Sequence, residues 1–374
     1  MSTWFSRVPA VRDNLHASTA QMSVLLLGMS VGSIAGLSLA PTIIARWDTR
    51  RGLFMSLGLT ALGLLLTGVA TDTYPSLAGA CAAQAVFGFA NGSTDVLMNV
   101  EGTRAEKATG QTRLPLMHGF FSVGTIVGAL LGALASTLSV PVSIHLSAMA
   151  VVTMAIGGLA VARLPRSDTA ELPAAETGEP STDLGGGWFD GRLLFVGIIL
   201  AGAAFAEGAG NDWISLAAVD GHAFTNAGGA YIYGCFVAAM TVGRLAGGRL
   251  LDRYSRAAVL AVLTAVGIAG VVLMILGTGP VLVVAGTLLW GLGLSLGFPV
   301  CISTAADHPT HAARRVSAVS ICGYATFLVG PPAIGFIGEH SGILSALWLV
   351  AAALAIALLC TPAIRRPSGR IECK

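Results

Sequence analysis

The sequence predicts an all-α polytopic membrane protein, and its composition carries most of that prediction. Only 11% of the residues are charged and the mean hydropathy is +0.78, whereas about 25% of the residues of a soluble domain are charged. The chain also has 48 glycines and 15 prolines. Both residue types are common in transmembrane helices, where small residues let backbones approach and neighbouring helices satisfy interrupted hydrogen bonds.

Eleven segments are long and apolar enough to cross a bilayer, which takes roughly 20 apolar residues. They are residues 21–44, 53–71, 76–99, 115–138, 141–162, 193–219, 228–250, 257–277, 280–304, 317–338 and 342–362. The stretch between the fifth and sixth spans has many Glu, Asp, Pro, Gly, Ser and Thr residues, a composition typical of flexible linkers. We therefore expect an N-terminal helix bundle (1–162), a linker (163–192) and a C-terminal bundle (193–374).

Basic residues indicate the orientation, because lysine and arginine near span ends are retained on the cytoplasmic side. Apart from Arg7 and Arg12, the lysines and arginines, 19 of 21, lie in one alternating set of connections or at the ends of the adjoining spans. Arg244 is counted here as such a span-end residue. The linker and the C-terminus are thus predicted to be cytoplasmic, with Met1 outside, in a cell (inner or plasma) membrane.

An internal repeat indicates a duplicated unit. The string VGSIAG (31–36) recurs as VGRLAG (242–247), and WFS (4–6) recurs as WIS (213–215). Only three residues precede Trp4, whereas about twenty membrane residues precede Trp213. We therefore expect Met1 to fall inside the first helix of a 12-helix fold, so that this helix is truncated and eleven complete spans remain. The alternative is a true eleven-helix protein.

Glu207 is the principal candidate for a functional residue. It lies near the midpoint of the apolar run 193–219, where a charged side chain costs at least about 2.5–3.5 kcal/mol on insertion scales. We expect this carboxyl group to border a water-filled cavity and to load and release a proton. The alternative is a carboxyl group that merely joins helices.

The residues after Glu207 extend this candidate site. Gly208 and Gly210 have no Cβ, so the helix can unwind there, as helices do at the binding sites of transporters. Asn211 lies one turn after Glu207 on the same face and is expected to line the cavity. We expect Asp212 to support an outer gate or to pack against a neighbour, and Trp213 to serve as a lid or an interface aromatic.

A second polar stripe follows one face of the span at 76–99. Its members fall within about 80° of one another at 100° per residue, and they are Gln84, Gly88, Asn91, Asp95, Asn99 and Gly102. Such a face suits a helix that lines a cavity, where Asp95 is the second candidate proton carrier. The equal alternative is that Asp95 caps the helix and pairs with Arg104 or Arg113.

Lesser candidates for contact with a solute are His118, Tyr231 and Tyr324. Tyrosines, Tyr233 included, can stack on sugar rings or bind them through the hydroxyl group, but they are also ordinary helix contacts. A lone histidine is more often a packed one. Arg7 can attract an anionic solute or reach lipid phosphates, and the sequence favours the second.

The segment from Gly247 to Arg256, GGRLLDRYSR, resembles the signature loop G-x-L-x-D-R-x-G-R of the major facilitator superfamily. The resemblance implies two six-helix halves, and it implies that Asp252 and Arg253 take part in a contact that gates the interface between the halves. The first-half counterpart is degenerate, with Ala45 in place of the aspartate and Asp48 where glycine is usual.

Three further stretches, WFSRVPAVRDNL (4–15), GFANGSTDVLMNVEG (88–102) and AEGAGNDW (206–213), resemble bacterial YbjJ-type members, which are similar to proton-coupled sugar symporters of the fucose type. Those symporters carry a proton-linked carboxyl group on the helix that matches 76–99, where Asp95 is the nearest candidate. The fourth span, GFFSVGTIVG (119–128), lacks the proline of the antiporter motif, which weakly disfavours efflux.

We therefore expect a secondary transporter that works by alternating access, with protons and a small polar solute, a sugar or related metabolite, as symported partners. The alternatives are a proton-linked efflux antiporter and a non-transporting sensor. The sequence has no Walker A loop, dinucleotide fingerprint or metal-ligand spacing, so we expect no enzyme, cofactor or metal. A formal charge of +2 implies no nucleic-acid partner, and we expect a monomer in the lipid bilayer.

Overall fold

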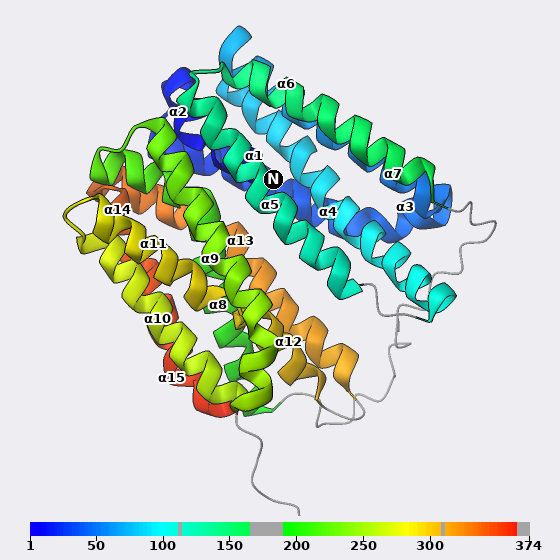
Figure 1. Ribbon diagram of the computed structural model, residues 1–374, viewed down its shortest axis with the longest axis vertical. Coiled ribbons are helices and arrows are strands. Elements are labelled where there is room, and N and C mark those ends of the chain that lie inside the picture. The colour runs from blue at the N-terminus through cyan, green and yellow to red at the C-terminus, as the bar shows by residue number, and fades with distance from the viewer. Residues whose placement is uncertain (111–113, 165–189, 308–310, 365–374) are drawn as a thin grey trace, which may run out of the picture.

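The computed structural model describes residues 1–110, 114–164, 190–307 and 311–364. Their regular secondary structure is entirely helical. Figure 1 shows α3 to α7 lying together on one side of the molecule and α8 to α15 lying together on the other. The predicted linker falls almost entirely outside the described residues, so its flexibility and the proposed division of the chain at 163–192 remain predictions.

The helices of the first group follow one another with short connections. They are α1 (Ser2–Phe5), α2 (Val8–Leu15), α3 (Thr19–Gly68) with the π-helical turn η1 (Val69–Thr73), α4 (Leu77–Thr109), α5 (Leu114–Thr137), α6 (Val142–Val152), η2 (Thr153–Gly157) and α7 (Gly158–Ala162).

The second group has a similar order of long helices. It contains α8 (Gly191–Leu216), η3 (Ala217–Gly221), α9 (Asn226–Arg253), α10 (Arg256–Leu276), α11 (Pro280–Leu294), α12 (Gly297–Ala306), α13 (Ala312–Ser341), α14 (Ile343–Ala346), α15 (Trp348–Cys360) and η4 (Thr361–Ile364).

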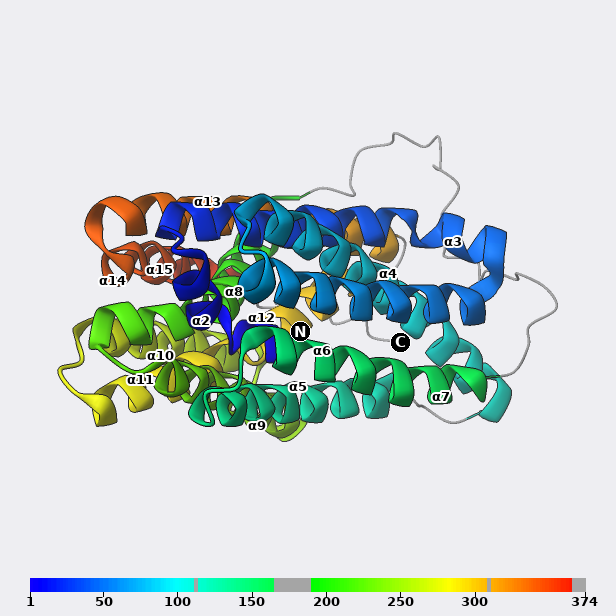
Figure 2. The same ribbon diagram turned by 90° about the horizontal axis from the view of Figure 1, so that it is seen from above.

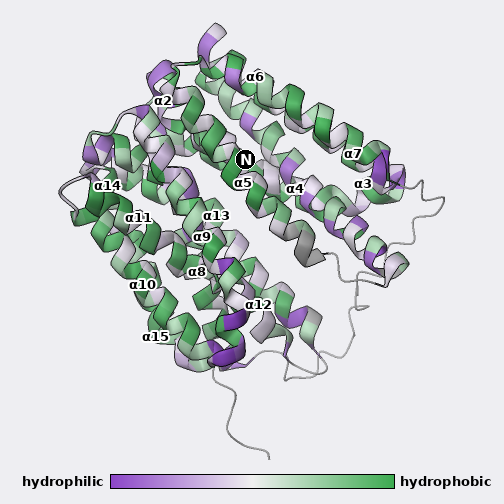
Figure 3. Cartoon of the chain, in the orientation of Figure 1, coloured by the Kyte–Doolittle hydropathy of each residue, from purple (hydrophilic) through white to green (hydrophobic). Residues whose placement is uncertain are grey.

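Nine segments of the described chain are long and apolar enough to cross a membrane. One of them, Thr19–Thr73, covers two predicted spans, because Asp48 has non-helical dihedrals (φ 62°, ψ 168°) that divide α3 into two arms. The predicted span at 76–99 lies in α4, which is not among the nine and carries the polar stripe. Figure 3 accordingly shows apolar residues along most of the helical length, with polar patches at helix ends and on α4. The predicted all-α membrane fold is confirmed.

Close packing of α3 on α4 depends on glycines. A Cβ added at Gly32 would overlap the backbone carbonyl of Ala85, and one added at Gly88 would overlap that of Met29. Small residues at such crossings let two membrane helices approach along their backbones. Gly88 was predicted to line a cavity, and that prediction is wrong because its face of α4 lies against α3.

The buried apolar residues form three clusters, and the largest contains residues of both groups. Trp4, Phe87 and Leu146 of the first group share it with Trp213, Phe236 and Trp290 of the second. A second cluster draws only on residues 193–364, and the smallest comprises Ile44, Leu53, Leu97 and Val161. The two groups of helices thus share a core around α1, α2 and α8, while the two separate cores include Val161 near the end of α7 and Leu193 near the start of α8.

Two pairs of long helices join the groups: α3 packs on α13 and α5 packs on α9. Figure 2, the view from above, shows α2 and α8 between the row of helices that contains α3 and α13 and the row that contains α5 and α9. We call the end that carries α2 and η3 the α2 end, and the opposite end, where Leu164 and Asp190 border the undescribed stretch, the linker end. This distinction organises the polar contacts described next.

Candidate functional site

Glu207 forms an ion pair with an arginine of the neighbouring helix. The Nη2 atom of Arg244 in α9 donates to Oε1 of Glu207 in α8 at 2.9 Å. The side chains retain 23% of their exposure at Glu207 and 32% at Arg244, so the pair borders open space and is not sealed in apolar packing. Both residues are more than about two turns from the ends of their helices, at a depth where charge is costly.

Sequence reasoning missed Arg244 as a site residue, because it was grouped with the basic residues at span ends. It lies nine residues before Arg253, the last residue of α9, which at 1.5 Å per residue is roughly 13 Å along the helix. The signal that identifies it is present in the sequence. The duplicated string has Ser33 in the first half where the second half has Arg244, so the second copy carries a charge within an otherwise apolar repeat.

Asn211 lies beside the ion pair and contacts a tyrosine. The hydroxyl group of Tyr233 in α9 donates to Oδ1 of Asn211 at 3.4 Å, and the charge of Glu207 acts on the same hydroxyl group. Tyr233 is 1% exposed and its ring packs on Phe5 with centroids 5.9 Å apart. The structure therefore brings Glu207 and Asn211 together as predicted, and adds Arg244 and Tyr233 to them.

The two glycines after Glu207 serve packing in this structure. Helix α8 runs unbroken from Gly191 to Leu216, so the predicted unwinding does not occur. A Cβ at Gly210 would overlap the ring of Phe236, and one at Gly208 would lie 3.2 Å from the ring of Phe327. The missing side chains let two aromatic rings approach α8 on either side of the site.

Asp212 and Trp213 lie in the core at the base of the site. Asp212 is 7% exposed and Trp213 is completely buried within the cluster shared by the two groups. The prediction of Trp213 as a lid is wrong for this structure, because an indole ring packed in a core covers no opening. Asp212 directly follows Asn211 in α8 and is buried in the interior, in contrast to the half-buried Asn211.

The residues of the predicted polar stripe on α4 differ in burial from one end of the helix to the other. Gln84 is completely buried and donates through Nε2 to Oγ1 of Thr67 at 3.0 Å, so its prediction as a solute ligand is wrong. Further along, Asn91 and Asn99 are half-buried and bond to the carbonyls of Phe87 and Asp95 one turn back. Packed helices cross at an angle, so they are in contact along only part of their length. One face of a long helix can therefore be buried against a neighbour near one end and exposed near the other.

Asp95 lies on α4 and is exposed. It is near enough to Tyr324 in α13 for its charge to act on that hydroxyl group. Arg104, one of the partners considered for Asp95, donates to Oγ1 of Thr49 at 2.6 Å and lies 3.5 Å from Glu101.

Tyr324 lines a cleft of about 470 Å³ between α3 and α13. The remaining lining residues are apolar apart from one serine, and they are Ile34, Leu37, Ser38, Ile321, Ala325 and Leu328. Tyr231 faces elsewhere, because Oγ1 of Thr137 in α5 donates to its hydroxyl group at 3.4 Å. The other predicted solute contact, His118, belongs to α5, but its side chain lies outside the described residues.

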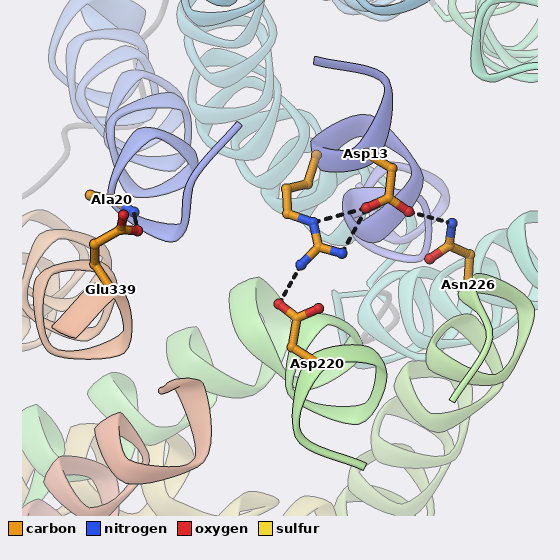
Figure 4. Close-up of polar contacts among 6 residues, drawn as sticks. Asp13, Ala20, Asp220, Asn226 and Glu339 are labelled. Atoms are coloured by element: carbon orange, nitrogen blue, oxygen red, sulfur yellow. Dashed lines mark hydrogen bonds and ion pairs between the residues drawn. The ribbon is translucent and has the colours of Figure 1, made fainter. Parts of the chain in front are cut away.

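Polar contacts join the two groups at the α2 end, as Figure 4 shows. Arg12 in α2 forms an ion pair with Asp220 in η3 and a second one with Asp13. The amide group of Asn226 at the start of α9 donates to Oδ2 of Asp13 at 2.9 Å. Oε2 of Glu339 in α13 accepts from the backbone N–H of residue 20 at 3.1 Å. Elements of the two groups are thus held together at this end.

Arg7 also lies at the α2 end, in the interior. It is 3% exposed and donates to Ser136 at 3.2 Å and to the carbonyl of Val140 at 2.6 Å. The interpretation that Arg7 reaches lipid phosphates is wrong, because the connection between α5 and α6 binds its guanidinium group. It borders a cavity of about 530 Å³ between that connection and the start of α9.

Hydrogen bonds and ion pairs identified at the linker end join elements of the same group. Arg50 donates to the carbonyl of Ala162, Arg256 lies 2.8 Å from Asp307, and Arg315 lies 3.1 Å from Asp190. Burial raises the pKa of Asp190, but hydrogen bonds from Arg315 and from the N–H of Leu193 outweigh it, so the pKa falls below its ordinary value.

The signature loop lies exposed at this same end. Asp252 and Arg253 are both exposed, and the guanidinium group of Arg253 lies 5.9 Å from the ring centroid of Tyr254. In the first-group counterpart, Asp48 accepts from the N–H of Arg51 at 2.8 Å and occupies a left-handed φ. Glycine is usual at that position because positive φ strains other residues. Asp48 therefore combines the turn with a cap for the second arm of α3.

Comparisons with known proteins agree with this architecture. An MFS-type transporter of Yersinia pestis is 30% identical over 354 residues, which cover 94% of this chain and 88% of that protein. The crystal structure of the nucleoside transporter NupG aligns with a TM-score of 0.75 over 97% of this chain and 95% of that one, at 16% identity. The structure of a variant of the Escherichia coli fucose:proton symporter aligns with a TM-score of 0.60 over 98% and 97% of the chains, at 17% identity.

The family profile of the Major Facilitator Superfamily matches residues 2–324 and, in a second alignment, residues 230–371. These matches extend over nearly the whole sequence and include the ion pair between α8 and α9 and the contacts at the α2 end. The chain is a transporter of the major facilitator superfamily.

Proposed function

We propose that this transporter carries a small polar solute, a sugar or related metabolite, together with protons by alternating access. In alternating access the two halves rock about a central site, so that the site opens to one side of the membrane at a time. The nucleoside transporter and the fucose:proton symporter with the same fold support this class of solute, although their identity to the chain is low.

The distribution of contacts supports an inward-facing arrangement. With the linker end at the cytoplasm, the contacts of Arg12 and Asp13 with Asp220 and Asn226 close the outer side, together with the shared core. The separate cores of the two groups lie toward the cytoplasm. The α2-end contacts would then be the outer gate, and Asp252 and Arg253 would take part in the inner gate after the halves rock.

The ion pair of Glu207 and Arg244 is the observation that carries the proposal. A proton taken up by Glu207 removes the carboxylate charge and so breaks the ion pair, whereas release of the proton restores it. Because both side chains are partly exposed, water and solute can reach them. Protonation at one side and release at the other couple the proton gradient to solute movement, with Asp95 beside Tyr324 as the second candidate carrier.

The other predicted residues have supporting roles. Asn211 and Tyr324 offer hydrogen-bond groups to a polar solute from the two sides of the site, and Asn91 and Asn99 extend the polar lining along α4. Gly208 and Gly210 permit the close ring contacts that would shift when α8 moves. We place the transporter in the bacterial inner membrane as a monomer, with the linker and the C-terminus in the cytoplasm.

Proteoliposomes with an imposed pH gradient test the proposal. The protein should concentrate a solute from a panel of sugars, organic acids and antibiotics, and Glu207→Gln should still exchange that solute but fail to concentrate it. The matched control is Glu101→Gln, which neutralises an ion-paired glutamate of α4 near Arg104 and should leave gradient-driven uptake intact. Unchanged uptake in Glu207→Gln would remove Glu207 from the coupling role.

The same assay separates two other functions. A proton-linked efflux antiporter would accumulate the solute when the lumen is acidic relative to the medium, and would not accumulate it under the opposite gradient that drives symport. A non-transporting sensor would bind a solute without flux in either direction. Symport is preferred because the proline of the antiporter motif is absent from 119–128.

A further inference from the structure

We infer that the solute is a small organic monoanion, such as a sugar acid, and that it moves with one proton in an electroneutral step. In this step the anionic group of the solute takes the place of the Glu207 carboxylate at Arg244. The inference rests on the proposed symport and adds the substrate class and the stoichiometry, which the family assignment does not give.

Arg244 lies inside a membrane-spanning helix of the described chain, nine residues before the last residue of α9. It is half-exposed and held by Glu207 at 2.9 Å, whereas Arg50, Arg104, Arg256 and Arg315 have partners near the linker end. A guanidinium group offers a planar set of N–H donors that matches a carboxylate. Glu207 is the carboxylate it binds in this structure, and a second carboxylate has the same geometry.

Charge balance at the site links the proton to the anion. If Glu207 takes up a proton and no anion enters, Arg244 stays behind as an uncompensated charge at membrane depth, which is strongly unfavourable. If an anion enters and Glu207 stays ionised, two carboxylates compete for one guanidinium group. Both penalties vanish when one proton and one monoanion arrive together, because the net charge of the site then does not change.

The groups around the ion pair are compatible with this exchange. On α8, Asn211 offers amide hydrogen-bond groups and Asp212 is buried behind it. On α9, Tyr233 binds Asn211 through its hydroxyl group. Outside these two helices, α13 carries Tyr324 in the cleft with α3, and α4 carries the exposed Asp95.

The chemical step is a proton transfer with an exchange of ion partners. A proton from external water binds a carboxylate oxygen of Glu207, and the ion pair with Arg244 breaks. The N–H groups of Arg244 then donate to the carboxylate of the solute. After the halves rock, the solute leaves toward the cytoplasm, Glu207 loses its proton to the cytoplasmic water, and the original ion pair forms again.

Uptake of gluconate and of glucose into proteoliposomes tests the substrate class, with pyranine in the lumen to report protons. We expect the pH gradient to concentrate gluconate and not glucose. A valinomycin clamp at 0 and at about −100 mV should give equal initial rates of gluconate uptake, because no net charge crosses the membrane. Concentration of glucose but not gluconate would overturn the inference and leave proton symport intact. Failure to concentrate gluconate while another solute of the panel is concentrated would do the same, and failure with every solute of the panel would overturn both.

Variants of the ion pair test the exchange itself. Arg244→Gln should lower gluconate uptake by more than about tenfold, as expected when a charge-assisted contact is lost, whereas Arg244→Lys should retain part of it. Glu207→Gln should still exchange gluconate at a rate independent of the clamped potential, because one anion replaces another. Any net uptake by this variant should depend on the potential, because the anion then moves without its proton.

A double variant guards against loss of folding. Glu207→Gln with Arg244→Gln leaves no unpaired charge, so it should elute from gel filtration in detergent as the wild type does and yet fail to take up gluconate. Gluconate uptake by this variant at the wild-type rate would overturn the role of Arg244. Potential-dependent uptake by the wild-type protein would overturn the one-to-one stoichiometry.

Discussion

Arg12 of α2 and Asp220 of η3 form an ion pair that joins the two halves of the transporter at the α2 end. The side chain of Arg12 is 18% exposed and that of Asp220 is 30% exposed. Partly exposed pairs of this kind contribute up to about 1 kcal/mol. The pair therefore biases the closed state of this end without locking it, as an element that opens in each cycle must.

The first prediction concerns this bias. Asp220→Asn should raise the population with an open α2 end by up to about fivefold, the change that about 1 kcal/mol produces. Spin labels at Tyr74 and Val281, which are 74% and 80% exposed, would report the distance between the halves by double electron–electron resonance. Asp307→Asn, which removes the partner of Arg256 within one half, is the control and should leave this distance unchanged. A reversed effect would mean that the pair does not hold the closed state.

The second prediction concerns the coupling of Glu207 with Arg244. Each single substitution, Glu207→Ala or Arg244→Ala, leaves one charged partner at membrane depth, so each should lower thermal stability in detergent by about 1–3 kcal/mol. The double substitution should cost less than the sum of the two. Melting followed by circular dichroism gives the four corners of this double-mutant cycle. Additive losses would indicate that the 2.9 Å contact contributes nothing to stability.

The sequence predicts the membrane helices well, because apolar length and small residues are local properties. The sequence does not predict which neighbouring helix each face contacts, and the role of a polar side chain depends on that contact. Gln84 shares its helical face with Asn91, yet Gln84 is buried against Thr67 while Asn91 is only half-buried. The angle at which α3 crosses α4 decides this difference in burial. The spacing of polar residues along a single helix contains no information about that angle.

Of the two residues of the central ion pair, the sequence predicts only one, Glu207, as a site residue. Glu207 interrupts an apolar run and is conspicuous, whereas Arg244 lies in a segment that also carries the basic signature loop, so it was grouped with that loop. The two tyrosines of α9 show the same limitation. Tyr231 and Tyr233 are two residues apart and point to different faces, and only contacts with Thr137 and Asn211 distinguish them.

The third prediction concerns pH. The pKa of Asp190 is raised by burial but lowered more by Arg315 and by the N–H of Leu193, so its net value is below the ordinary one. A carboxyl group with a lowered pKa in the folded state stabilises the protein fully above the unfolded pKa of about 3.9, and loses that contribution as the pH falls through the lower folded value.

Stability measured from pH 7 down to pH 3 checks this sign. Asp190→Asn should be less stable than the wild type at pH 7, and the difference should shrink at the acidic end of the range. The effect should stay below about 1 kcal/mol, because the Asp190 side chain is 49% exposed and solvent screens it. Asp190→Ala should cost more, since it also removes the cap on α8. A difference that grows toward low pH would contradict the assignment.

The fourth prediction uses two glycines in neighbouring helices. A Cβ at Gly210 would overlap the ring of Phe236, whereas one at Gly248 would have nothing within 4 Å. Gly210→Ala should therefore destabilise by about 1–3 kcal/mol through overpacking, and Gly248→Ala should be neutral or stabilise α9 by up to about 1 kcal/mol. Combining Gly210→Ala with Phe236→Leu should recover part of the loss, because the smaller side chain makes room for the methyl group. Equal melting temperatures for the two alanine variants would mean that α8 and α9 separate easily at this point, and that the close contact of Gly210 with Phe236 contributes nothing to stability.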